Sequence, residues 1–213
     1  IRWKLLSHEK IKHENVFKWQ EINVNCSAKY FKIISKSNNL MLFEIAFKDI
    51  NDNLIKIYNT NTNVLFDEQN LVPKKQSYKN STYFDEIYHA RSAFEILNNL
   101  PIYEITHPPL GKDIMSLGIY IFGMTPFGYR VMGNLIGILM IPLMYVFSKK
   151  IFKSNFWGNF SALLISLDFM HFTQTRIATI DSYTTFFIIC MYYFMYQFYN
   201  LNFKDLTSKK LFL

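Results

Sequence analysis

The stretch VMGNLIGILMIPLMYVFS, residues 131–148, is strongly apolar and contains no charged side chain. A helix needs about 20 consecutive apolar residues to cross the hydrocarbon core of a bilayer. The stretch therefore predicts a membrane-spanning helix, and it places the chain among the α-helical membrane proteins.

Two further apolar runs follow, at residues 156–172 and 183–201. The three runs together predict a polytopic helical membrane domain with aromatic side chains at its interfaces. If all three runs cross, the lysines after the first and third runs lie on one side, which the positive-inside rule puts in the cytoplasm. We then expect residues 1–130 and the loop 173–181 to be extracytoplasmic, at a bacterial plasma membrane. The lysines concerned are Lys149, Lys150, Lys153, Lys204, Lys209 and Lys210.

Composition limits the classes of function. The chain has 213 residues and a formal net charge of +7, and most of its charged side chains precede about residue 115. No basic face stands out, so we expect no nucleic-acid partner. Cys26 and Cys190 lie in different environments and predict two free thiols. Because Ile1 opens the chain without a signal segment, we expect a piece of a longer protein.

The amino-terminal region, residues 1–78, has the pattern of short strands. Runs that alternate with period two are separated by Asn-, Ser- and Asp-rich turns, notably residues 49–53. This pattern predicts a small extracytoplasmic β-sandwich, and it resembles the discoidin-like, carbohydrate-binding jelly rolls. Its function is open between a structural spacer and a module that binds sugar or peptide. The predicted strands are residues 17–24, 29–34, 40–47 and 54–58.

Residues 85–98 predict an amphipathic helix on the membrane surface. Ile87, Ala90, Phe94 and Leu97 recur at helical spacing, and Asn-Asn-Leu-Pro at 98–101 is a stop signal. The first turn contains the adjacent carboxylates Asp85 and Glu86, which the helix dipole favours, and His89 lies four residues after Asp85 on the same side.

The segment THPPLGK, residues 106–112, places His107 and Lys112 around a rigid Pro-Pro turn. Unpaired charge is costly near a membrane, so these ionisable side chains and those of the 85–98 helix indicate chemistry rather than packing. Helix capping alone explains one of the two adjacent acids, not the whole group.

Several motifs in order resemble the protein O-mannosyltransferases, which belong to the GT-C class of polyprenyl-phosphate-sugar-dependent glycosyltransferases. The motifs are FDE with His89, HPPLGK, FG at 122–123, PFGYR at 126–130 and QTRIATID at 174–181. The resemblance covers about residues 65–200 and suggests a bacterial member. It implies that residues 79–213 are the amino-terminal part of a GT-C transmembrane catalytic domain. The implied activity is transfer of mannose from a polyprenyl-phosphate-mannose donor to Ser or Thr hydroxyls of proteins, with inversion.

The resemblance also implies roles for individual residues. Asp85 occupies the position of the family's catalytic aspartate and is the expected general base. Glu86 is expected to orient the acceptor or the sugar, or to help hold a cation; its alternative is a helix-terminal charge. Arg130 is expected to bind the leaving phosphate, and its alternative is an arginine that reaches to the membrane interface.

Other candidates for donor or acceptor binding keep open alternatives. Arg176 is expected to share the phosphate, or else to form an ion pair with Asp181 that fixes their loop. His89, His107 and Lys112 are expected to support the substrates, with structural roles equally open. Two further residues, Asp168 and His171, either line a sugar pocket or lie at the interface.

No metal site follows from spacing, because Cys-rich and HExxH patterns are absent from the sequence. A divalent cation is left without assigned ligands. The sequence also has no Gly-rich nucleotide loop, which suits a lipid-linked donor. Two alternatives remain: a GT-C transferase that moves another sugar to lipid A or a cell-wall polymer, and a non-enzymatic, membrane-anchored glycan-binding protein.

Overall fold

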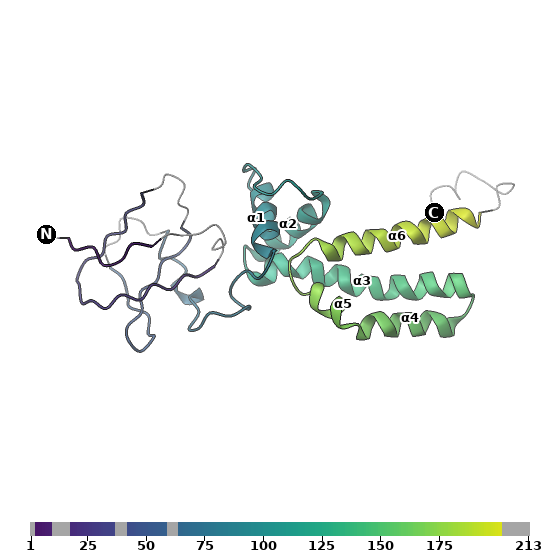
Figure 1. The fold of residues 1–213 in the computed structure, drawn as a ribbon, viewed down its shortest axis with the longest axis horizontal. Coiled ribbons are helices and arrows are strands. Elements are labelled where there is room, and N and C mark those ends of the chain that lie inside the picture. The colour runs from purple at the N-terminus through teal and green to yellow at the C-terminus, as the bar shows by residue number, and fades with distance from the viewer. Residues whose placement is uncertain (1–2, 10–17, 37–41, 59–63, 202–213) are drawn as a thin grey trace. The chain divides into compact units, whose positions relative to one another are not determined.

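The structure, a computed structural model, describes residues 3–9, 18–36, 42–58 and 64–201 (Figure 1). The chain divides into two units, Ile1–Ser81 and Thr82–Leu213. The lysines at 204, 209 and 210, which entered the predicted topology, lie outside the described residues.

The predicted β-sandwich is wrong for the described part of the first unit. No strand occurs there, and the β pairing is limited to an isolated antiparallel bridge between Lys48 and Leu54. The first position of the predicted strand 17–24 and the first two of 40–47 lie outside the described residues.

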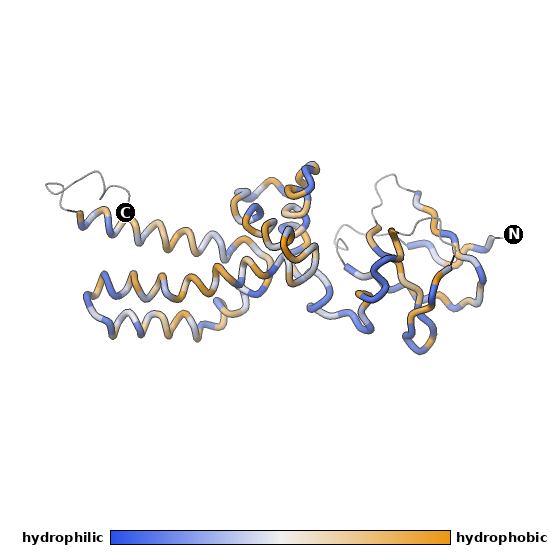
Figure 2. The backbone as a smooth tube through the Cα atoms, turned by 180° about the vertical axis from the view of Figure 1, so that it is seen from behind, coloured by the Kyte–Doolittle hydropathy of each residue, from blue (hydrophilic) through white to orange (hydrophobic). Residues whose placement is uncertain are grey.

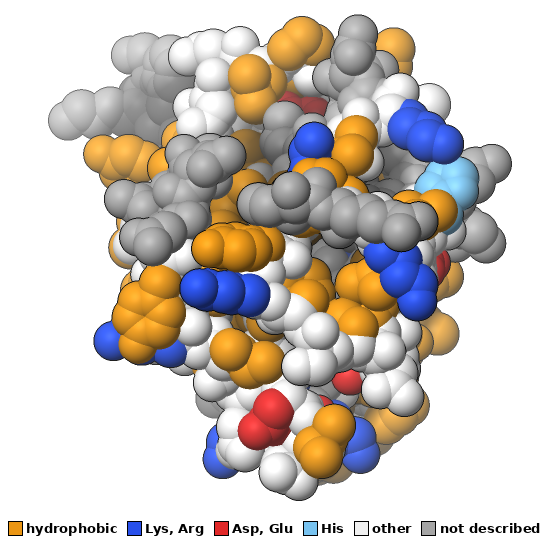
Figure 3. All heavy atoms as spheres, turned by 90° about the vertical axis from the view of Figure 1, so that its left-hand side faces the viewer, with side chains coloured by type: hydrophobic (Ala, Val, Ile, Leu, Met, Phe, Trp, Pro, Cys, Tyr) orange, Lys and Arg blue, Asp and Glu red, His pale blue; other side chains and the backbone are white. Residues whose placement is uncertain are grey.

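The physical reason is that the alternating pattern has no partner to bury it. Large apolar side chains of the predicted strands are exposed, with Ile34 at 70%. On the face of the molecule that Figure 3 draws, hydrophobic side chains lie scattered among those of Lys and Arg. Period-two alternation stabilises a strand only where neighbouring strands or a helix cover its apolar face.

Local hydrogen bonds give the first unit its described structure. The Asp49 carboxylate accepts hydrogen bonds from the backbone N–H groups of Asn51 (2.8 Å) and Asn53 (2.9 Å), so the expected turn at 49–53 is present. A short 3-10 helix, η2, covers Gln69–Leu71. The Gln69 side chain donates to the carbonyl of Ile45 at 2.8 Å.

The second unit is helical. α1 packs on α2, α2 packs on α3, and α3 contacts both α4 and α6. Figure 1 shows α3, α4 and α6 running alongside one another, with α1 and α2 at one end of this group. The helices are α1 (Glu86–Leu97), α2 (Leu110–Phe122), α3 (Pro126–Phe152), α4 (Asn155–Leu167), α5 (Phe169–Gln174) and α6 (Asp181–Tyr199).

The helix predicted at residues 85–98 is confirmed as α1, and it ends at the expected Asn-Asn-Leu-Pro signal. Its buried residues include the apolar Ile87 and Ala90 and also the polar Glu86, His89 and Ser92. Burial therefore extends beyond the one apolar face that the sequence indicated, and α1 belongs to the core of the second unit.

The prediction of three membrane spans is also wrong. In the described part of the chain one helix, α3, is long and apolar enough to cross a membrane. The second run is broken at Asp168, whose carboxylate caps the separate helix α5 by accepting from the His171 N–H at 2.6 Å. The third run forms α6, which mixes apolar side chains with Asp, Thr and Tyr (Figure 2).

A close approach between α2 and α3 fixes the start of α3. Gly123 joins the two helices with φ 76°, a conformation that glycine adopts without strain. Thr125 caps α3 by accepting from the Gly128 N–H at 3.1 Å. A Cβ on Gly118 would lie 2.3 Å from the Gly128 carbonyl oxygen, so only glycine allows this packing. The first turns of α3 are thereby held near α1.

Candidate active site

Asp85 lies directly before α1 and is half-buried. Its side chain makes no capping hydrogen bond, and among the described residues no donor or cation pairs with its carboxylate. The preceding residue, Phe84, has φ 51°, which is the left-handed region and costs free energy for a bulky side chain. Within the described residues, Asp85 is thus a carboxylate on a strained turn without a hydrogen-bond or ion-pair partner, although its charge acts on the ring of His89.

Glu86, the next residue, is in the opposite state. It is fully buried, and its two carboxylate oxygens accept hydrogen bonds from Arg130 Nε and Nη2, each at 2.6 Å. The backbone N–H of Tyr83 donates to Oε2 at 2.7 Å, and that of Ala178 donates to Oε1 at 2.8 Å. We call these four residues the Glu86 centre.

The Glu86 centre joins α1, α3 and the loop before α6. A guanidinium that grips a carboxylate with two parallel hydrogen bonds is a strong and geometrically specific pair. The structure therefore places Arg130 on a protein carboxylate, and the expected binding of phosphate by Arg130 stays a prediction. For Glu86, this position favours a role in holding the site together.

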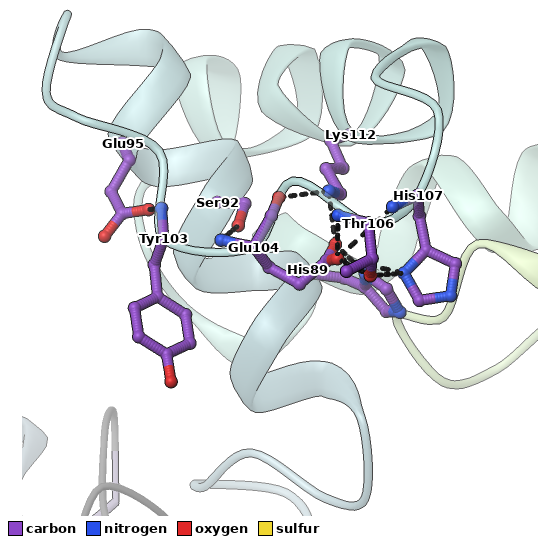
Figure 4. Close-up of polar contacts among 8 residues, drawn as sticks. All are labelled: His89, Ser92, Glu95, Tyr103, Glu104, Thr106, His107 and Lys112. Atoms are coloured by element: carbon purple, nitrogen blue, oxygen red, sulfur yellow. Dashed lines mark hydrogen bonds and ion pairs between the residues drawn. The ribbon is translucent and has the colours of Figure 1, made fainter.

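A second carboxylate, the partly buried Glu104, lies in the loop between α1 and α2 (Figure 4). Lys112 forms an ion pair with Glu104 Oε2 and also donates to the Glu104 carbonyl at 2.6 Å. The His107 Nδ1 atom lies 3.1 Å from Oε1, and the Thr106 N–H donates to Oε1 at 2.7 Å. His89 Nδ1 lies 3.8 Å from Oε2. We call these five residues the Glu104 cluster.

The contacts of the Glu104 cluster shift two pKa values. Burial by itself raises the pKa of the Glu104 carboxyl, but hydrogen bonds from Lys112, Thr106 and His107 outweigh it and hold this pKa well below its ordinary value. Burial lowers the pKa of His89, and the nearby His107 and Lys112 lower it further. Glu104 is therefore charged and His89 neutral near neutral pH.

Sequence reasoning brought together His89, His107 and Lys112 but missed Glu104, the carboxylate that organises them. A signal was present, because Glu104 lies three residues before His107 in YEITHPPLGK. An acid so close to a histidine and a lysine beside a rigid turn predicts a local ion pair.

The remaining candidates lie apart from these contacts. Arg176 is exposed, with its guanidinium 4.6 Å from the centre of the Phe172 ring. Asp181 is exposed at the start of α6, and within the described residues no ion pair joins it to Arg176. The His171 ring nitrogen Nε2 lies 3.1 Å from the Gly137 carbonyl oxygen, so this histidine connects α5 to α3.

Comparison with known proteins finds a family that resembles the carboxyl-terminal part of the chain. The family described as dolichyl-phosphate-mannose-protein mannosyltransferase matches residues 118–213. The matched region runs from α2 to the carboxyl end and includes Arg130, Arg176 and Asp181. Asp85, Glu86 and the Glu104 cluster precede it.

Relatives of the chain include proteins that share part of its sequence. The chain is 31% identical over 115 residues to the polyprenol-phosphate-mannose–protein mannosyltransferase of Mycobacterium tuberculosis, a match that covers 51% of this chain and 22% of that protein. It is 28% identical, with the same coverage, to the protein of that name from Mycolicibacterium smegmatis. It is 31% identical over 137 residues, 61% of this chain and 26% of the relative, to an uncharacterized protein of Aquifex aeolicus.

The chain spans about a fifth of the length of the mycobacterial relatives, 22%. No solved structure matches it.

Proposed function

We propose that this chain is part of a membrane enzyme that transfers mannose from a polyprenyl-phosphate-mannose donor to Ser or Thr hydroxyls of proteins, with inversion at the anomeric carbon. The match to the mannosyltransferase family over residues 118–213 supports the reaction class, and the names of the mycobacterial relatives give a polyprenol-phosphate-mannose donor and a protein acceptor. The observation that carries the proposal is the contrast between Asp85, whose carboxylate has no partner in the described part, and the clamped Glu86.

In the proposed reaction Asp85 is the general base. It accepts the proton of the acceptor hydroxyl while that oxygen attacks the anomeric carbon of mannose. The bond between the anomeric carbon and the phosphate oxygen breaks, and the lipid phosphate leaves with the bonding electrons. A single displacement of this kind inverts the anomeric centre. A carboxylate already committed to an arginine and two backbone N–H groups is a poorer base than one without partners.

Cations near the leaving phosphate stabilise its charge. Among the basic candidates for donor or acceptor binding, Arg176 is exposed and His107 is exposed although it contacts Glu104, whereas Lys112 is buried on Glu104 and Arg130 is paired with Glu86. The exposed pair therefore suits direct contact with the donor or acceptor, and the engaged pair suits placement of the surrounding loops.

The proposed orientation follows from α3. Lys149 and Lys150 lie in its last turn, and the positive-inside rule assigns that end to the cytoplasm. Arg130, in the first turns of α3, then lies at the extracytoplasmic end, with the Glu86 centre. The donor, the acceptor protein and the bilayer are the proposed partners.

The test uses the full-length protein in membranes, polyprenyl-phosphate-mannose and a Ser/Thr-rich peptide. We expect Asp85→Asn to lower the rate of mannosyl transfer by about 10²- to 10⁴-fold, because general-base catalysis is lost. Its thermal stability should change little, since in the described part of the chain the carboxylate has no hydrogen-bond or ion-pair partner to lose. Asp113→Asn is the matched control, because Asp113 is an exposed aspartate in the first turn of α2.

Equal transfer by wild type and Asp85→Asn would refute the role of Asp85. Failure of the wild-type protein to mannosylate the peptide, while it transfers another sugar to a lipid or polymer acceptor, would refute the proposed reaction.

A further inference from the structure

Three side chains of the Glu104 cluster converge on one point. His89, Glu104 and His107 each offer one ligand atom, and these atoms lie within 4.8 Å of one another. They come from α1 and from the loop that precedes α2, so the fold rather than a short motif assembles them. Figure 4 shows both imidazoles directed toward the Glu104 carboxylate.

We propose that His89, Glu104 and His107 form a binding site for a divalent transition-metal ion, with Zn²⁺ as the best-suited ion. Two imidazoles and one carboxylate are a ligand set found in zinc sites that keep a fourth position open. Imidazole also selects transition metals over Mg²⁺ and Ca²⁺, which prefer oxygen ligands.

The distances are close to those that a bound ion needs. Bonds of about 2.0–2.1 Å in a tetrahedral site put neighbouring ligand atoms roughly 3.3 Å apart. Here His107 Nδ1 lies 3.1 Å and His89 Nδ1 lies 3.8 Å from Glu104 oxygens. The first distance runs to Oε1 and the second to Oε2, so the carboxylate lies between the two rings at separations near those of a bound ion.

The state of His89 is an independent observation. Its side chain is only 5% exposed, and its Nδ1 atom has no hydrogen-bond partner within the described part of the chain. Leaving a buried polar nitrogen unsatisfied is unfavourable, and such groups call for an explanation. A metal ion bonded to Nδ1 supplies the missing partner.

The carboxylate is held in place as metal ligands usually are. Glu104 Oε1 accepts from the backbone N–H groups of Thr106 and His107, which fixes the direction of the carboxylate. His107 is 49% exposed and gives an ion a route from solvent.

Lys112 opposes the ion, because its ammonium group pairs with Oε2. It also bonds the Glu104 carbonyl, so it keeps a partner when Oε2 turns toward the metal.

The experiment measures Zn²⁺ binding by the full-length protein in detergent, after removal of metal with a chelator. We expect one Zn²⁺ per chain at this site, and we expect His89→Gln and His107→Gln each to weaken its affinity by at least tenfold. His8→Gln is the matched control, because His8 is an exposed histidine of the first unit. Circular dichroism of the metal-free variants checks that each one is folded.

A second readout identifies the ligands directly. Co²⁺ in place of Zn²⁺ should give the strong visible absorption of a four-coordinate site, and His107→Gln should abolish it, while His8→Gln retains it. Binding that is unchanged in both folded variants, or no binding of Zn²⁺ by the wild-type protein, would overturn the proposal. Neither readout depends on mannosyl transfer, so the result is separate from that of the activity test.

Discussion

The Glu86 centre and the Glu104 cluster contain similar interactions but differ in their structural role. Each centres on a carboxylate, fully buried for Glu86 and partly buried for Glu104, that pairs with a Lys or Arg and accepts hydrogen bonds from backbone N–H groups. Glu86 connects segments far apart in sequence, and its four contacts surround it. Glu104 connects the loop between α1 and α2 to His89 and Lys112 of those helices, and it also contacts His107, which is half-exposed. An ion pair whose contacts are all internal thus holds helices together, whereas one that includes a solvent-exposed side chain is a candidate binding site.

The largest effect on stability is expected from breaking the ion pair between Glu86 and Arg130. Arg130→Met leaves the fully buried Glu86 carboxylate without its cation, and loss of one partner of a buried pair typically lowers the free energy of unfolding by about 3–5 kcal/mol. The double variant Glu86→Gln with Arg130→Met should recover much of this loss. Denaturant unfolding in detergent measures both, and a loss under about 1 kcal/mol would show that the centre is not a clamp.

A smaller loss of stability is expected from breaking the ion pair of the Glu104 cluster. Lys112→Met removes the cation from Glu104, which keeps its hydrogen bonds from the Thr106 and His107 N–H groups. We expect a decrease of about 1–3 kcal/mol in the free energy of unfolding, measured as for Arg130. Lys149→Met, at an exposed lysine in the last turn of α3, is the control and should change stability by less than about 0.5 kcal/mol. If Lys112→Met costs as much as Arg130→Met, the two carboxylates do not differ.

The smallest effect is a dependence of stability on pH that belongs to the Glu104 cluster. The pKa of His89 is lowered from 6.5, so the unfolded chain binds a proton that the folded chain rejects, and stability should fall as the pH drops below about 6.5. The pKa of Glu104 is lowered from 4.5, so its contribution to stability is lost as the pH falls further, below about 4.5.

Thermal melts in the presence of a chelator would measure this dependence. His89→Gln should flatten the curve between about pH 5 and 7, where an unperturbed histidine titrates. The same slope in wild type and His89→Gln would assign it to other groups.

The sequence predicted the elements that depend on neighbouring residues, and it did not predict the features that depend on contacts between distant residues. The stop signal after Leu97 and the apolar stretch 131–148 identified α1 and α3, because the deciding residues are neighbours in sequence. The strand pattern failed, because alternation alone does not supply a partner for Ile33 or Ile34. The span count failed, because Asp168 ends α4 and starts α5.

The candidate site shows the same limit. The sequence singled out Glu86 and Arg130 as candidates for substrate contact, each with another role left open, and nothing in their spacing of 44 residues reveals that they face each other. Glu104 was missed although its partners were named. Only the packing of α1 against the following loop brings His89 to this carboxylate.

Pro142 gives the long helix α3 a mechanical property of its own. A proline ring has no N–H to donate, so the carbonyl of Ile138 loses its helical partner and the rod is weakest there. The half before this point is locked to its neighbour, since a Cβ on Gly137 would lie 2.5 Å from Thr175. The two halves of α3 therefore differ, because the half that carries Arg130 is packed closely against Thr175 and the missing backbone hydrogen bond at Ile138 separates it from the half that follows.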